Sequence, residues 1–206
     1  MSHAFAQIAF TPAVKAAQAR DGSRAGYARA FESDAAELSH LALGPDEADF
    51  IAQQRSFYIA SVSETGWPYV QHRGGPKGFL KVLDERRIAF ADFAGNRQLI
   101  SVGNAAGNDR VALILVDYAH RVRLKLLGRV SVQALEPASA LAEQLLTPGY
   151  TAKAQRAMVI TVEGFDWNCP QHIPLRIDAE DVQAALDARD ARIAELEHML
   201  AAAKSA

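Results

Sequence analysis

The sequence predicts a mainly β protein with flanking helices. Between residues 56 and 135, short apolar or alternating segments follow one another with turn residues between them, which is typical of an antiparallel barrel or sandwich. Helical patterns are short within this region, so a βαβ sheet is not expected. After residue 178, large aliphatic residues recur at nearly heptad spacing, which predicts a long C-terminal helix.

The predicted elements define three regions: an N-terminal helical arm at 1–45, a central β domain at 46–177 and an amphipathic helix at 178–206. The arm is expected to hold helices near 12–19 and 34–41. A helix opens at Pro45, where proline and acidic residues suit a first turn, and runs to Arg55. The expected strands are 56–63, 68–73, 78–83, 87–91, 110–117, 120–126, 128–135 and 158–162. A turn at Gly128 is expected to join strands 120–126 and 128–135 into a hairpin. Shorter helices are expected at 98–104 and 137–146.

The composition restricts the classes of function. A formal net charge of −2 gives no general attraction to nucleic acid or to an anionic membrane. No apolar run approaches the roughly 18 residues that span a bilayer, and the N-terminus lacks the pattern of a secretory signal. The single Cys169 excludes an intramolecular disulfide and fits the cytoplasm. The six histidines are scattered, so no metal site is expected.

Cations and glycines gather around one predicted hairpin. Arg73, Lys77 and Lys81 lie among three glycines, and Arg97 follows in the next polar turn. Glycine allows close approach of the backbone to a ligand, and cations beside free N–H groups suit a phosphate. The pattern favours a phosphate-binding cradle, whereas the alternative is a set of solvated residues at strand ends.

Two further segments carry unusual side chains. Alternation places Arg121, Arg123 and Lys125 on one face of a strand, either as a solvent face or as donors to a ring ligand. The segment 165–174 contains Trp167, Cys169 and His172, which are compatible with packing or with ligand contact.

These residues resemble the pyridoxamine 5′-phosphate oxidase-like, FMN-binding split-barrel family over residues 50–132. Its R-x-V-L-L-K strand corresponds to Pro76-Lys77-Gly78-Phe79-Leu80-Lys81. Its F-Y-T-N and G-S-R-K segments correspond to Phe90-Ala91-Asp92-Phe93 and Gly95-Asn96-Arg97-Gln98. Arg123 falls where the family has a glutamine that touches the flavin.

The resemblance implies a six-stranded antiparallel split β-barrel that forms a homodimer with two FMN sites at the interface. The segment 167–172 and Arg176 would then come from the opposite subunit. The cofactor-binding residues that this implies are Arg73, Pro76, Lys77, Gly78, Phe79, Leu80, Lys81, Ala91, Asp92, Asn96, Arg97, Gln98, Arg123, Asn168, Cys169, Gln171 and His172.

The chain also departs from the family pattern. Pro76 and Gln98 stand where the family has an arginine and a lysine, so Arg97 must meet the phosphate with help from Arg73 or Lys77. The substrate helix of the true oxidases lacks its Tyr and Arg here, so vitamin B6 oxidation is not expected. The sequence therefore predicts an FMN-dependent oxidoreductase with a small-molecule partner such as NAD(P)H, and identifies no catalytic residue. The alternatives are a non-catalytic flavin sensor with a partner-recruiting helix, and a barrel that holds haem or deazaflavin.

Overall fold

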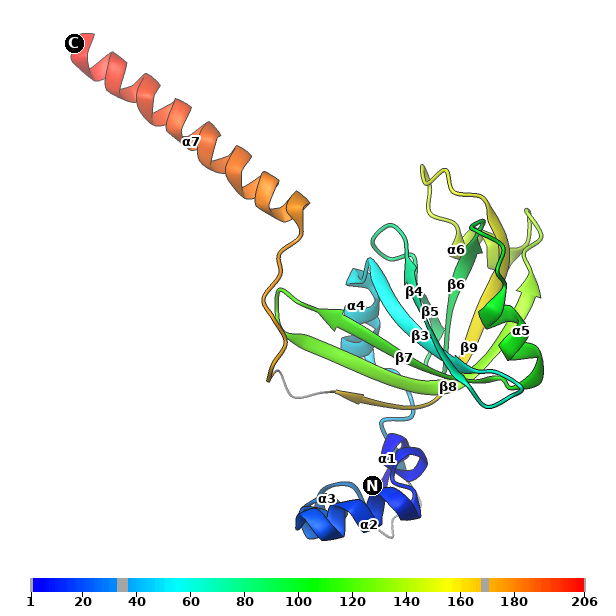
Figure 1. The fold of residues 1–206 in the computed structure, drawn as a ribbon. Helices are drawn as coiled ribbons and strands as arrows, with labels where there is room; N and C mark the ends of the chain where they lie inside the picture. Colours follow the sequence, from blue (N-terminus) through cyan, green and yellow to red (C-terminus); the bar gives the residue numbers. More distant parts are fainter. Residues whose placement is uncertain (1, 33–36, 168–170, 206) are drawn as a thin grey trace. The chain divides into compact units, whose positions relative to one another are not determined.

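The structure is a computed structural model that describes residues 2–32, 37–167 and 171–205 (Figure 1). The described chain divides into two compact units. The first lies within Met1–Val116 and Arg123–Cys169, and the second within Asp117–Val122 and Pro170–Ala206.

Three short helices open the first unit: α1 (Ala4–Ala9), α2 (Pro12–Asp21) and α3 (Arg24–Phe31). The Thr11 side chain caps α2 by accepting a hydrogen bond from the Val14 N–H, and Gly22 ends it in the left-handed conformation with φ 80°, which costs glycine little. The helix expected near 12–19 is confirmed.

The second helix expected in the arm, at 34–41, is wrong for its C-terminal half. Leu38–Ser39 form the short strand β2, which pairs in parallel with β1 (Ser2–His3). The Ser2 N–H donates to the Glu37 carbonyl oxygen at 3.0 Å. These two backbone groups therefore join two segments of the chain and form no hydrogen bond within a helix. Residues 34–36 lie outside the described residues.

A histidine pair connects this N-terminal segment to the large sheet. The rings of His3 and His40 stack at 4.0 Å between centroids, and His3 Nε2 lies 3.6 Å from the Asp166 carboxylate on β9. The backbone of Phe5 approaches β9 so closely that a Cβ on Gly164 would lie 2.6 Å from the Phe5 nitrogen. Glycine is therefore required where α1 meets β9.

One helix, α4 (Pro45–Gln53), precedes the sheet, as expected. The strands that follow are β3 (Ser56–Val62), β4 (Pro68–Gly74), β5 (Lys81–Asp84), β6 (Arg87–Phe93), β7 (Arg110–Asp117), β8 (Val122–Ala134) and β9 (Ala154–Trp167). They form a seven-stranded sheet in the order β4-β3-β7-β8-β9-β6-β5. The large antiparallel sheet with helices agrees with the predicted fold class, but the described residues do not confirm the count of six strands.

The turn expected at Gly128 is wrong. β8 continues through it, and the register with β9 shifts between Leu127 and Gly128, which marks a bulge. A Cβ on Gly128 would lie 2.4 Å from the Thr161 carbonyl oxygen. Glycine is present because two backbones approach each other here, not because the chain reverses.

The core fills the inside of the curved sheet with aromatic and aliphatic side chains. The Phe57 ring stacks on Phe79 at 5.7 Å and meets Phe90 edge-on at 5.1 Å. Leu124 and Leu126 of β8 are fully buried, whereas the intervening residue Lys125 is not. The alternation predicted for this strand is confirmed.

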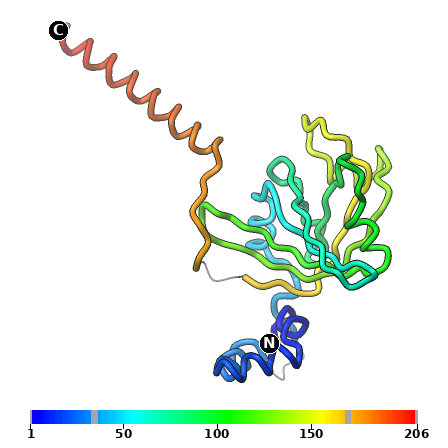
Figure 2. The backbone as a smooth tube through the Cα atoms, in the orientation of Figure 1, coloured from blue at the N-terminus to red at the C-terminus, as the bar shows by residue number. Residues whose placement is uncertain are grey.

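Helices α5 (Ile100–Gly107) and α6 (Ala140–Leu145) complete the first unit. The second unit consists mainly of α7 (Ala179–Ser205), a single uninterrupted helix (Figure 2). No described helix is long and apolar enough to cross a membrane. Within residues 2–32, 37–167 and 171–205, no cluster of three His, Cys, Asp or Glu residues could hold a metal ion.

The histidine pair predicts that docking of the N-terminal segment depends on pH. Burial lowers the pKa of His3, neighbouring His40 and Lys125 lower it further, and Asp166 partly raises it. The undocked form then binds a proton more readily than the docked form, so docking is strongest above the ordinary histidine pKa of about 6.5 and is lost as the pH falls through the lowered value. Hydrogen-exchange protection of residues 4–9, corrected for intrinsic rates, should fall between about pH 8 and pH 5. His3→Phe should remove most of this dependence, and equal protection at both pH values in the native protein would contradict it.

Candidate functional site

An ion pair joins strands that are not neighbours in the sheet. The Arg73 guanidinium of β4 lies 2.5 Å from the Asp92 carboxylate of β6, measured from Nη1 to Oδ1. β4 is at one end of the sheet order and β6 is next to the other end, so the sheet must curl until β4 lies across from β6. We call the line where β4 faces β6 the seam.

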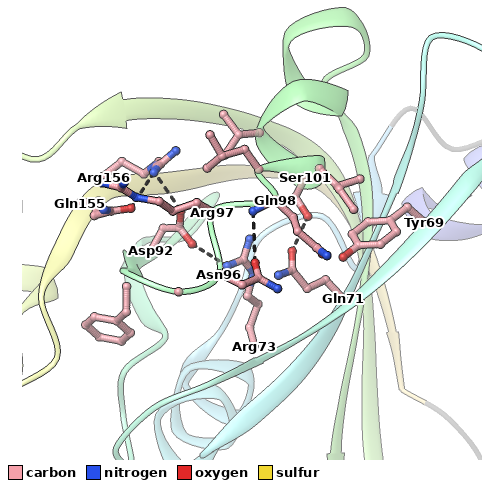
Figure 3. A pocket seen from close by; sticks show the side chains of 15 residues that line it. Tyr69, Gln71, Arg73, Asp92, Asn96, Arg97, Gln98, Ser101, Gln155 and Arg156 are labelled. Atoms are coloured by element: carbon pink, nitrogen blue, oxygen red, sulfur yellow. Dashed lines mark hydrogen bonds and ion pairs between the residues drawn. The ribbon is translucent and has the colours of Figure 1, made fainter.

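A second arginine holds the other oxygen of the same carboxylate. Arg156 Nε of β9 lies 3.2 Å from Asp92 Oδ2, because Asp92 and Arg156 are register partners in the β6–β9 ladder. Only 8% of the Asp92 side chain is exposed. Figure 3 shows both arginines directed at this one carboxylate.

A cavity of about 60 Å³ lies at the seam beside these groups. We call it the seam pocket, and it is lined by Tyr69, Gln71, Arg73, Asp92, Phe93, Gly95, Asn96, Arg97, Gln98, Leu99, Ile100, Ser101, Val102, Gln155 and Arg156. One wall of the seam pocket is formed by β4. Side chains alternate between the two faces of a strand, so Tyr69, Gln71 and Arg73 share the face that lines the pocket.

The loop between β6 and α5 forms the opposite wall. Arg97 and Leu99 are held in the left-handed region with φ values of 62° and 55°, a costly conformation that clusters at functional sites. Asn96 stabilises the turn because its side-chain oxygen accepts the Gln98 N–H at 3.2 Å. Ser101 of α5 donates to the Gln71 side chain at 2.7 Å, which ties the loop side of the pocket to β4.

The charge and size of the seam pocket fit a small dianion. Its lining contains three guanidinium groups, of Arg73, Arg97 and Arg156, and one carboxylate, of Asp92, which leaves a net charge of +2. The volume corresponds to about two water molecules at ~30 Å³ each. The small size and the polar, cationic lining suit a terminal oxyanion group better than a fused ring system.

A second cavity adjoins the first across Arg73. Its volume is about 180 Å³, and it is lined by His72, Arg73, Gly74, Phe79, Phe90, Ala91 and Phe93. We call it the aromatic cavity. The Arg73 Nε atom is buried without a hydrogen-bond partner in the described residues, so this arginine retains donor capacity beside both cavities.

The segment that runs from α4 to β9 identifies the family to which the chain belongs. Residues 43–166, more than half of the 206 residues, match the pyridoxamine 5′-phosphate oxidase family. The chain belongs to this family. A search of curated proteins found no match.

Solved structures with similar folds include three relatives of low identity. A putative pyridoxamine 5′-phosphate oxidase from Lactobacillus delbrueckii is 17% identical with a TM-score of 0.46, covering 61% of this chain and 93% of its own. An FMN-binding protein from Syntrophomonas wolfei is 10% identical with a TM-score of 0.44, covering 59% and 83%. HutZ, a heme storage protein from Vibrio cholerae, is 15% identical with a TM-score of 0.43, covering 61% and 94%. These similarities are too low to assign a ligand.

The structure brings only some of the residues implied by the family pattern into the two cavities. The seam pocket contains Arg73, Asp92, Asn96, Arg97 and Gln98, and the aromatic cavity contains Phe79 and Ala91. Five others line neither cavity: Pro76, Lys77, Gly78, Leu80 and Lys81.

The remaining predicted residues lie elsewhere. Arg123 is on β8, where its Nε is buried without a partner in the described residues. Gln171 and His172 belong to the second unit and are exposed, while Asn168 and Cys169 lie outside the described residues.

Trp167 is held within its own chain. Its indole N–H donates to the Glu47 carboxylate of α4 at 2.7 Å, and its ring meets Phe50 edge-on at 4.8 Å. These contacts give it a packing role within the first unit, and its contact with a flavin of the opposite subunit stays a prediction.

Sequence reasoning missed Tyr69, Gln71, Ser101 and Arg156. The period of two along β4 was a usable signal for Tyr69 and Gln71, since both share the face of Arg73. No local signal marks Arg156, because its place depends on the β6–β9 register.

The Asp92 carboxylate should be important for stability because it compensates two partly buried cations. Asp92→Asn should lower the free energy of unfolding by about 3 kcal/mol, the typical cost of leaving a buried charge unpaired. Asp109→Asn provides the matched control, since it breaks the exposed pair with Arg129 and should cost less than about 1 kcal/mol. Urea denaturation measures both, and equal effects would contradict the role given to the seam.

Proposed function

We propose that the protein is an FMN-binding flavoprotein with oxidoreductase activity. The observation that carries the proposal is the seam pocket, where three arginines from separate segments surround a space fit for one oxyanion. Membership of the pyridoxamine 5′-phosphate oxidase family supports a flavin as the molecule that bears this oxyanion.

Arg97 is the principal phosphate ligand in this proposal. Arg73 and Arg156 already share the Asp92 carboxylate, whereas Arg97 lines the pocket from an exposed loop. Arg73 and Arg156 then contribute charge from fixed positions, and Gln71, Asn96 and Gln98 contribute polar contacts. Each charge-assisted hydrogen bond contributes about 1.5–3 kcal/mol.

The aromatic cavity and β8 are the proposed neighbours of the ring. The cavity offers phenylalanine side chains beside Arg73, and Arg123 offers a buried donor without a partner in the described residues. When bound, FMN supplies reversible hydride or electron transfer, while the protein binds it and tunes its ring. A small-molecule donor or acceptor such as NAD(P)H is proposed as the reaction partner.

A second copy of the chain is proposed to complete the site. A largely apolar surface cavity of about 240 Å³ lies over β3, β4, β7 and β8. It is lined by Phe5, Tyr58, Ala60, Val70, Ala112, Leu113, Ile114, Lys125, Leu126 and Leu127. Contiguous exposed apolar surface of this kind marks an interface. Contact of the partner's Asn168, Cys169, Gln171 and His172 with the flavin remains what the family resemblance implies.

Arg97→Ala should weaken FMN binding about 10- to 100-fold, since it removes one charge-assisted contact with the phosphate. Flavin content after gel filtration and fluorescence titration of the apoprotein measure the change. Arg87→Ala is the control, because Arg87 pairs with Asp84 and does not line the pocket. Full flavin stoichiometry and unchanged affinity in Arg97→Ala would show that the phosphate lies elsewhere.

The competing functions give different spectra. A purified protein with the two-banded flavin absorbance supports the proposal, a Soret band would indicate haem at a site such as His72, and a deazaflavin would show its own shorter-wavelength band. Anaerobic addition of NADH or NADPH should bleach the bound flavin. A flavin that stays oxidised with both would favour the alternative of a non-catalytic sensor, for which the exposed apolar residues of α7 provide a recruiting surface.

A further inference from the structure

Helix α7 presents large apolar side chains to solvent along its length. It has 27 residues, which corresponds to about 40 Å at 1.5 Å per residue. Its exposed large hydrophobic residues are Val182, Leu186, Ile193, Leu196, Met199 and Leu200. A helix of this length and composition gains stability chiefly by burying such residues against a partner.

The apolar residues of α7 follow a heptad with a single polar layer. The a positions hold Ala179, Leu186, Ile193 and Leu200, and the d positions hold Val182, Arg189, Leu196 and Ala203. This alternating spacing of three and four residues is the a/d pattern of a coiled coil.

We infer that α7 forms a parallel, in-register, two-stranded coiled coil with α7 of a second copy of this chain. The inference does not rest on the proposed function, since it uses residues of α7 alone.

Charges that flank the a and d positions favour a second copy of α7 as the partner and a parallel direction. Arg192 is at a g position, and Glu197, five residues later, is at the following e position. A parallel pair places each g residue beside the next e residue of the partner, so two Arg192–Glu197 pairs form by symmetry. In the single chain, Arg192 pairs with Glu195 on its own helix at 2.5 Å, and Glu197 forms no ion pair within the described residues.

An antiparallel pair would place like charges together. In that direction e faces e and g faces g. The register that aligns Leu186 with Ala203 sets Asp190 against Glu197, and the register that aligns Leu186 with Leu196 sets Arg192 against Arg192.

The polar d residue supports the same register. Arg189 now contacts Asp190 on its own helix at 3.0 Å. In a parallel dimer, the d side chain also packs against the e residue of the partner, which is again Asp190. In-register pairing also places the two Arg189 side chains in one d layer, where the Asp190 carboxylates of both helices offset their repulsion. Such a polar layer costs stability but pins register and oligomer state.

Disulfide trapping in the full chain tests the direction. Val182→Cys and Ala203→Cys place a thiol at the first and last d layers, each in a background with the single native cysteine, Cys169, replaced by serine. Each variant alone should form a disulfide-linked dimer under mild oxidation. Two further cysteine pairs report the antiparallel registers: Val182→Cys mixed with Leu200→Cys, and Leu186→Cys mixed with Ala203→Cys. Linkage only in one of these mixtures would show an antiparallel pair, and no linkage in any case would show that a second copy does not occupy this face; both results overturn the inference.

Charge reversal tests the pairing itself. Arg192→Glu and Glu197→Arg, each in the Val182→Cys background, should separately reduce trapped dimer about tenfold at low salt, because each creates two repulsive pairs. Mixing the two variants should restore it as the heterodimer, identified by mass. Asp187→Arg is the matched control at an outward b position and should change nothing, while far-UV circular dichroism reports whether each helix remains folded. A statistical mixture of homodimers and heterodimers would overturn the charge pairing.

Discussion

The contact between Arg73 and Asp92 is the constraint on which the first unit depends. Backbone hydrogen bonds join the seven strands in one order, and they leave β4 and β6 without a ladder between them. The ion pair connects these two strands at 2.5 Å, with Arg156 on the far oxygen of the same carboxylate. Desolvation offsets much of what a partly buried ion pair contributes to stability. Its main consequence is therefore positional: two guanidinium groups are fixed beside one small cavity.

That positional effect explains how the chain can depart from its family pattern. Pro76 and Gln98 replace two cations of the pattern, yet the seam pocket still has a net charge of +2 from its lining. In our proposal Arg73 and Arg156 supply the missing charge from β4 and β9, while Arg97 keeps its place in the loop. The same proposal places the oxyanion of the ligand at the seam and its ring beside the aromatic cavity.

The sequence was most informative where structure depends on nearby residues. Proline, acidic residues and alternation predicted α4 and most strands, and heptad spacing predicted α7. It failed at Gly128, where glycine serves a close approach between β8 and β9 that only the three-dimensional pairing reveals. The predicted cradle met the same limit: Arg73 and Arg97 both line the seam pocket, Lys77 and Lys81 line neither cavity, and phosphate binding there stays a prediction. Arg156 could not be found because the β6–β9 register, not sequence proximity, places it beside Asp92.

The central claim is that the seam pocket recognises a terminal phosphate, and the most direct measurement compares two ligands that differ only in that group. Isothermal titration of the apoprotein with FMN and with riboflavin isolates the phosphate contribution. The account predicts that FMN binds at least about 100-fold more tightly than riboflavin, as expected for two or more charge-assisted contacts, and that the difference narrows at high salt. Equal affinity for the two ligands would contradict it.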